Sequence, residues 1–417
     1  MLLAGLMSGT SLDGIDAALL EIEDGGPGGT EFAAGGTAAG QRASGENADR
    51  AAPGLRWRIL AFRSRPYSDA QREVIREAVE GRARVPELAR LHVYLGEWFA
   101  GALLSLLEEA GVRPEEVAAI GSHGQTVRHD PPRGSERGHS FQLGDPATLA
   151  ERTGTPVVSD FRARDLAAGG HGAPLVPRAD LLLFHEPGRA RALQNLGGMG
   201  NVTWLPPSGD PAQVRGFDTG PGVALLDEAA ARATGGKWDR DLDGALARQG
   251  RVDEALLKEL LTDPYFEEEP PRSTGRERFG PPLIDRLARE LPPGRPEEWV
   301  DLLATLTALT ARSVADSYRR WILPLGLDEV VLLGGGSRNP ALVDAIRHEL
   351  TGELGRIPLR GGDALGIDPD AREAAAFAVL AWCHLRGLPG NVPAVTGAEG
   401  ERVLGSWTPG RDVGGTG

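Results

Sequence analysis

The sequence predicts an α/β protein with more than one domain, on three observations. Short apolar runs of strand length alternate with longer helical stretches along the chain, as in sheets covered by helices. The chain has 417 residues, more than the usual size of one domain. Its content of 41% apolar and 25% charged residues is ordinary for a globular protein. These features favour two or more α/β units with large cores.

The N-terminus predicts a β-hairpin. Leu2–Leu6 reads as a buried strand and Ile15–Ile22 as its returning partner. The polar turn Ser8–Gly14 between them carries glycines where tight backbone is needed. Gly25–Pro53 is dominated by Gly and Ala, so it is expected to be a flexible surface insertion. Arg56–Phe62 alternates like a strand.

The remaining helices and strands are predicted from the spacing of apolar residues and from residues typical of helix ends. Ser68 is the expected N-cap of a helix over 68–80, and Gly111 is expected to end a second helix. Leu302, Leu303, Leu306 and Leu309 form one apolar stripe of a third helix. The expected strands are 117–120, 157–159, 192–194, 202–205 and 330–333, and the expected helices are 86–110, 297–322, 340–350 and 371–385.

Charge and composition exclude several function classes. The 45 basic and 59 acidic residues give a net charge of 45 − 59 = −14, which argues against a nucleic-acid or anionic-membrane binder. Lys237 and Lys258 are the only lysines, and neither has the context of a Walker-type or protein-kinase lysine. The single cysteine, Cys383, lies in an apolar run and is expected to be buried. No signal peptide or membrane span is predicted, so a cytoplasmic location is expected.

Three glycine-bearing turns each follow a predicted strand. They are Gly9–Gly14, Asn195–Asn201 and Gly334–Asn339. Small residues let backbone N–H groups approach phosphate oxygens, which suits a chain with few lysines. Each turn alone is also ordinary tight-turn chemistry, and none fits a dinucleotide-binding fingerprint.

Polar side chains near these turns are candidates for chemistry. Asp218 is predicted to sit in a rigid Gly/Pro turn over 216–222, either as a general base or as a local Asx hydrogen-bond acceptor. His123, Gln125 and Arg128 are expected at the end of a strand, which favours a ligand site. The segment 160–165, with Arg162, Arg164 and Asp165, is either a solvated ion-pair cluster or a loop that binds a sugar or carboxylate.

Taken together, these motifs resemble the anhydro-N-acetylmuramic acid kinase family over essentially the whole chain. The segments that carry the resemblance are 5–16, 121–126, 160–162, 169–177, 195–198, 216–222, 273–279, 334–336 and 388–397. His171 stands where the family commonly has glutamine, a difference that concerns fine substrate contacts.

The resemblance implies a two-domain actin-like ATPase (ribonuclease H-like) fold with an ATP cleft between the domains. It implies one domain over 1–187, with the insertion at 25–53, completed by 366–417, and a second domain over 188–365. It also implies that ATP, water and 1,6-anhydro-N-acetylmuramic acid give N-acetylmuramic acid 6-phosphate and ADP, with Mg²⁺, in peptidoglycan recycling. A homodimer is expected from the resemblance alone.

The same resemblance assigns roles to residues. Asp218 matches the catalytic aspartate, Glu373 matches a carboxylate near the sugar, and Asp13 is a candidate Mg²⁺ ligand. The expected ATP-binding residues are Gly9, Thr10, Ser11, Leu12, Asp13, Gly14, Ile15, Asp16, Asn195, Gly197, Gly198, Gly334, Gly335 and Gly336. The expected substrate-binding residues are His123, Gln125, Arg128, Arg164, Asp165 and Glu373.

Two alternatives stay open at this point. One is another sugar kinase of the same fold that acts on an intact hydroxyl. The other is a non-catalytic ATP-binding sensor, against which a fixed base such as Asp218 argues, because a sensor needs none.

Overall fold

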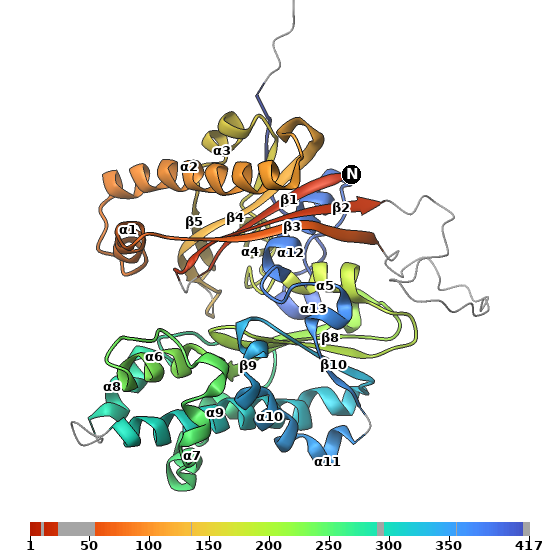
Figure 1. The fold of residues 1–417 in the computed structure, drawn as a ribbon. Coiled ribbons are helices and arrows are strands. Elements are labelled where there is room, and N and C mark those ends of the chain that lie inside the picture. The colour runs from red at the N-terminus through yellow and green to blue at the C-terminus, as the bar shows by residue number, and fades with distance from the viewer. Residues whose placement is uncertain (10–11, 24–54, 135, 290–295, 356, 412–417) are drawn as a thin grey trace, which may run out of the picture. The chain divides into compact units, whose positions relative to one another are not determined.

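The computed structural model describes residues 1–9, 12–23, 55–134, 136–289, 296–355 and 357–411 (Figure 1). The predicted insertion at 25–53 and the turn residues Thr10 and Ser11 lie outside these ranges. The chain forms two compact units. Unit 1 comprises Met1–His185, Gly209–Val214 and Ala371–Gly417, and unit 2 comprises Glu186–Ser208 and Arg215–Asp370.

Unit 1 is built on a seven-stranded sheet in the order β12-β6-β4-β1-β2-β3, with β5 beside β4. Its strands are β1 Leu2–Ser8, β2 Gly14–Glu23, β3 Arg56–Pro66, β4 Val117–Asp130, β5 His139–Leu143, β6 Val157–Ser159 and β12 Ser406–Thr408. Its α-helices are α1 Asp69–Val79, α2 Val85–Ala110, α3 Pro146–Thr153, α4 Ala163–Ala167, α5 Val176–Phe184, α12 Arg372–Leu385 and α13 Pro393–Thr396.

The two faces of this sheet are covered by α2 and α12 (Figure 1). Alternate side chains of β1 point to opposite faces, so Ala4 and Leu6 join the core under α2. Gly5 faces α12, where a side chain would overlap the carbonyl oxygen of Ala374. Cys383 of α12 is fully buried, as predicted.

Unit 2 carries a five-stranded sheet in the order β11-β10-β7-β8-β9. Its strands are β7 Arg191–Leu196, β8 Met199–Leu205, β9 Arg215–Pro221, β10 Glu329–Leu333 and β11 Leu359–Gly361. Its α-helices are α6 Ala224–Ala233, α7 Glu254–Leu260, α8 Pro281–Ala288, α9 Pro296–Ser317, α10 Pro340–Glu349 and α11 Thr351–Leu354. The predicted leucine stripe of α9 is buried against α6, α7 and α8.

The two sheets share one connection pattern. In unit 1, β1, β2 and β3 pair antiparallel, and β4 and β6 then extend the sheet parallel to β1. In unit 2, β7, β8 and β9 pair antiparallel, and β10 and β11 extend the sheet parallel to β7. The predicted two-unit α/β fold is confirmed, and both sheets have the strand order of a ribonuclease H-like domain. No helix within the described ranges is long and apolar enough to cross a membrane.

Two local predictions were wrong, for the same reason. Asp218 lies on strand β9 and pairs with Asn201 of β8, not in a turn. Residues 121–128 continue strand β4 instead of following its end. In both places hydrogen bonding to neighbouring strands keeps the backbone extended through glycine-containing sequence.

Candidate functional site

In unit 1, the turn between β1 and β2 is tied to β4 by buried hydrogen bonds. The Ser8 hydroxyl donates to Oε1 of Gln125 at 2.6 Å, and the Tyr67 hydroxyl donates to Ser8 at 2.9 Å. The Gln125 amide in turn donates to the carbonyl of Gly9 at 3.3 Å. Gln125 is completely buried, so its position is that of a support for the hairpin.

The described hairpin residues differ in exposure. Asp13 is exposed at the turn, Asp16 is half-buried, and Gly14 and Ile15 are buried at the start of β2. Leu12 is buried in the α2 core and adopts the left-handed region, with φ 57°, which costs energy for a residue with a branched side chain. Among the described residues, no three or more His, Cys, Asp or Glu side chains gather as a metal site. An exposed Asp13 nevertheless fits Mg²⁺ carried by phosphates, because such ions need only one or two protein carboxylates.

His123 of β4 is held as a neutral ring. Its Nδ1 lies 2.8 Å from the carbonyl of Gly124, and Arg162 donates to Nε2 from Nη2 at 2.8 Å and from Nε at 3.1 Å. Burial, with Arg162 adding to it, lowers the pKa of His123 well below its usual value. His123 therefore donates through Nδ1 and accepts through Nε2.

Arg162 holds this histidine and feels the charge of the Glu373 carboxylate nearby. Its Nη1 donates to the carbonyl of Gly172 at 2.7 Å, so three guanidinium contacts are fixed by protein. Burial lowers the pKa of Arg162 to about 10, while the nearby Glu373 and Asp165 carboxylates act to raise it. The guanidinium is still a cation at neutral pH.

Glu373 lies in the first turn of α12 and is partly exposed. Burial raises its pKa, Arg372 and Arg162 act to lower it, and Asp13 raises it further. The adjacent Arg372 is buried and pairs through two hydrogen bonds with buried Asp180 of α5, with Nε 3.0 Å from Oδ1. This pair fixes the first turn of α12 and with it the backbone of Glu373.

The other three predicted substrate residues of unit 1 are placed very differently. Asp165 is fully buried and accepts from Asn391 at 2.7 Å, from Thr396 at 2.8 Å and from the Gly172 amide at 2.8 Å. Arg128 is exposed and pairs with Asp130, with Nη2 2.9 Å from Oδ1. Arg164 is exposed and donates to the carbonyl of Val403 at 3.2 Å.

In unit 2, Asp218 is held by a dense set of contacts. Its Oδ2 accepts from the Thr274 amide at 2.9 Å. Its backbone carbonyl accepts from the Tyr265 hydroxyl at 2.7 Å and from Nε of Arg272 at 3.1 Å. Burial raises the pKa of Asp218 to about 7, although the Thr274 amide and Arg272 act to lower it and Glu277 adds to the rise. A carboxyl with this pKa can accept a proton near neutral pH.

The predicted glycine loops of unit 2 meet one another. A Cβ on Gly334 would lie 2.5 Å from Oδ1 of Asn195 and 3.1 Å from the amide nitrogen of Gly197. One on Gly336 would lie 2.8 Å from the carbonyl oxygen of Leu196. Gly335 is exposed with open space beside it. Only residues without side chains allow this approach, so the loops after β7 and β10 pack backbone against backbone. The partly exposed Gly197 and Gly198 and the exposed Gly335 leave a surface of glycine backbone accessible.

The start of α6 completes this surface. The amides of Val223 and Ala224 donate to the carbonyls of Gly197 and Gly198 at 2.8 and 3.2 Å. The Gly222 amide also donates to Gly198 at 3.0 Å. The loop carbonyls are thus turned toward α6, which fixes the loop conformation.

Sequence reasoning missed the residues that surround Asp218 and Gly198. Tyr265, Arg272, Thr274 and Arg276 were outside the predicted set, although segment 273–279 was part of the family resemblance. They come from a segment about 50 residues after β9. No local sequence pattern predicts that this segment contacts Asp218 and Gly198. The only signal available was the unusual density of Arg and Glu beside Gly275.

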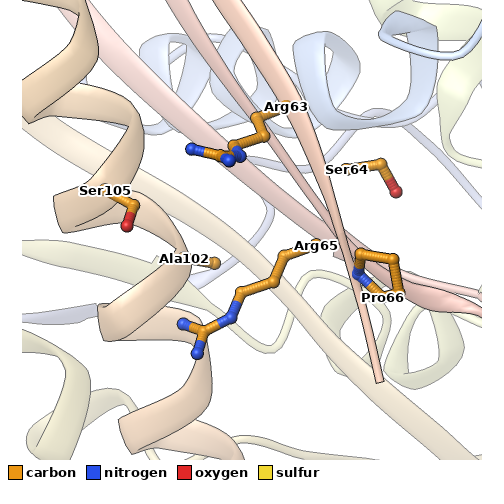
Figure 2. Close-up of a pocket in the computed structure, with 6 residues that line it drawn as sticks. All are labelled: Arg63, Ser64, Arg65, Pro66, Ala102 and Ser105. Carbon is orange, nitrogen blue, oxygen red and sulfur yellow. The ribbon is translucent and has the colours of Figure 1, made fainter. Parts of the chain in front are cut away.

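A separate cavity of about 280 Å³ opens between β3 and α2 in unit 1. Figure 2 shows Arg63 and Arg65 extending from β3 toward α2, with Ser105 opposite. None of the predicted site residues lines it. Arg63 is paired with Glu109, and both arginines of the lining are exposed.

Comparison with known proteins shows to which family this chain is similar. The family model described as anhydro-N-acetylmuramic acid kinase matches residues 49–410. A protein of that name from Gloeobacter violaceus is 45% identical over 98% of this chain and 98% of its own length. One from Caldanaerobacter subterraneus subsp. tengcongensis is 41% identical over 97% of this chain and 96% of its own.

Some solved structures resemble this chain at low sequence identity. An activator of 2-hydroxyisocaproyl-CoA dehydratase from Clostridium difficile matches at a TM-score of 0.42 and 13% identity, covering 93% of this chain and 96% of that one. These values are too low to bear on chemistry. The family match and the full-length relatives decide the matter: the chain belongs to the anhydro-N-acetylmuramic acid kinase family.

Proposed function

We propose that this chain phosphorylates 1,6-anhydro-N-acetylmuramic acid with ATP and water, giving N-acetylmuramic acid 6-phosphate and ADP. Membership of the family supports the substrate and the reaction. The role proposed for it in the cell is the recycling of peptidoglycan fragments in the cytoplasm.

The raised pKa of the Asp218 carboxyl is the observation that supports the proposed mechanism. Its carboxyl, with a pKa of about 7, takes a proton from water as the water oxygen attacks the anomeric carbon. The bond from that carbon to O6 breaks, and its electron pair stays on O6. O6 then attacks the γ-phosphorus, and ADP leaves. Because Asp218 must be deprotonated, turnover should fall as the pH drops below about 7.

The phosphates are proposed to bind to backbone amides. The accessible backbone of Gly197, Gly198 and Gly335 supports this in unit 2, and the glycine-bearing sequence of residues 9–16 supports it in unit 1. Mg²⁺, held by Asp13 and the nucleotide, would neutralise phosphate charge when bound.

The sugar contacts are proposed for unit 1. The partly exposed Glu373 offers a carboxylate, and the buried His123 acts by holding the Arg162 guanidinium in place. The exposed Arg128 and Arg164 could meet an anionic group of the substrate, whereas Gln125 and the buried Asp165 act through the loops that they hold. A homodimer, expected from the family resemblance, is tested by light scattering on the purified chain.

The deciding experiment is ADP release with and without 1,6-anhydro-N-acetylmuramic acid, followed by product analysis in ¹⁸O-labelled water. The proposal predicts sugar-dependent ADP release and label on the anomeric oxygen of the product. Sugar-dependent ADP release without label would indicate a kinase for an intact hydroxyl. Nucleotide binding with no ADP release would indicate a sensor instead.

A further inference from the structure

Arg276 lies against the glycine loop that is proposed to hold phosphate. A Cβ built on Gly198 would lie 3.5 Å from Nη2 and 3.8 Å from Nε of Arg276. The loop cannot easily withdraw, because the Gly198 carbonyl accepts from the amides of Gly222 and Ala224. The guanidinium is therefore next to a fixed backbone surface within unit 2.

This guanidinium is also available for a ligand. Within the described ranges, Arg276 makes no hydrogen bond or ion pair through its side chain, and it is exposed. The two nearby arginines in the sequence already interact with other protein groups. Arg272 is buried and donates to the carbonyls of Tyr265, Phe266 and Glu268. Arg278 lies 3.7 Å from Asp263 and 3.6 Å from Glu268, over the ring of Tyr265.

The segment that carries Arg276 also holds the proposed base. Thr274, two residues earlier, donates its amide to Oδ2 of Asp218 at 2.9 Å. One short stretch of chain thus fixes Asp218 and sets a cation beside the Gly198 loop.

Phosphoryl transfer needs positive charge where negative charge develops. This chain has only two lysines, and neither has a phosphate-loop context. A planar guanidinium can donate two parallel hydrogen bonds to phosphate oxygens. We propose that Arg276 is a catalytic residue that contacts the transferring phosphoryl group and stabilises its charge as O6 attacks. It stays protonated throughout, so no proton moves through it.

This inference rests on the proposed function, and the test keeps the two apart. Arg276→Ala and Arg276→Lys are compared with wild type and with Arg251→Ala. The last variant removes another exposed guanidinium of unit 2, which makes no side-chain hydrogen bond or ion pair among the described residues. The expected result is a loss of kcat of roughly 10²–10³-fold for R276A, with a smaller loss for R276K. ADP affinity and the acidic limb of the pH profile should stay as in wild type, and R251A should be unaffected.

Two further measurements distinguish a catalytic role of Arg276 from a purely structural effect of replacing it. Binding of ADP with aluminium fluoride, which mimics the transferring group, should weaken in R276A far more than binding of ADP. Added guanidinium should restore part of the lost turnover. Wild-type kcat in R276A, or equal loss of ADP and ADP–aluminium fluoride affinity, would overturn the role of Arg276. A wild-type enzyme that releases no ADP with the sugar would instead overturn the proposed function.

Discussion

The first helix after the third strand begins differently in the two units, although their strand order is the same. In unit 1, α1 is capped by its own sequence: Ser68 accepts from the Gln71 amide at 3.3 Å, and the Gln71 side chain accepts from the Ser68 amide at 2.9 Å. In unit 2, α6 has no side-chain cap, and its first amides donate to the carbonyls of Gly197 and Gly198. The first amides of α6 are therefore held by the proposed phosphate loop, while the first amides of α1 are capped by side chains at the start of the helix itself.

The units also use glycine differently. In unit 1, Gly5 and Gly121 let the backbone of α12 lie directly on the sheet, where a side chain would overlap the carbonyls of Ala374 and Phe377. In unit 2, Gly222, Gly334 and Gly336 let loops lie on loops. Close backbone contact thus serves helix packing in unit 1 and the proposed site in unit 2. This difference can be tested by substitution.

The largest effect is expected from Asp218→Asn in unit 2. The amide keeps the shape and the hydrogen bond from Thr274 but cannot take a proton. Turnover should fall roughly 10²–10⁴-fold, while ATP affinity measured by calorimetry stays within about twofold of wild type. Retained turnover would assign the base to another residue, and Glu373 in unit 1 is the carboxylate to substitute next.

Glycine substitutions separate packing from function. Gly121→Ala should lower the free energy of unfolding by about 1–3 kcal/mol, because overpacking forces α12 away from the sheet. Gly222→Ala should cost a similar amount and should also raise the KM for ATP, because its Cβ would overlap the carbonyl of Gly197.

The matched control for both is Gly352→Ala in α11, where nothing lies within 4 Å of the added atom. Chemical denaturation and steady-state kinetics on the three variants supply the measurements. A KM for ATP that stays at the wild-type value in G222A would show that the start of α6 is not coupled to nucleotide binding.

The sequence predicts those features of the two units that depend on residues close together in the chain. The β1–β2 hairpin, the Ser68 cap and the Gly111 helix end, with φ 66°, all follow from neighbouring residues. The sequence singles out Asp218 as a carboxylate among glycines, but its strand conformation depends on pairing with β8. The contact of Arg162 with His123 joins residues 39 positions apart, and no pattern along the chain encodes it.

The raised pKa of Asp218 predicts a stability effect opposite to that of an ordinary paired carboxylate. Between its usual value near 3.8 and about 7, the folded chain holds a proton that the unfolded chain has lost. Stability therefore falls as the pH rises through this window. Asp218→Asn should melt at a higher temperature than wild type at pH 8, by about 2–4 °C for each kcal/mol gained. The advantage should shrink toward pH 4 in calorimetric melts, and an equal advantage at both pH values would contradict the raised pKa.

The smallest effect, and the cleanest contrast between the units, is expected from Ser68→Ala. Removing this cap leaves the Gln71 amide without its acceptor, which should cost about 1 kcal/mol of stability. Because, among the described residues, the Ser68 hydroxyl hydrogen-bonds only with the Gln71 amide of its own helix, kcat and the KM for ATP should not change. Unit 2 offers no equivalent substitution, since the acceptors for the first amides of α6 are backbone carbonyls. If S68A alters the KM for ATP, then helix starts in both units respond to the nucleotide, and the proposed division of roles between them fails.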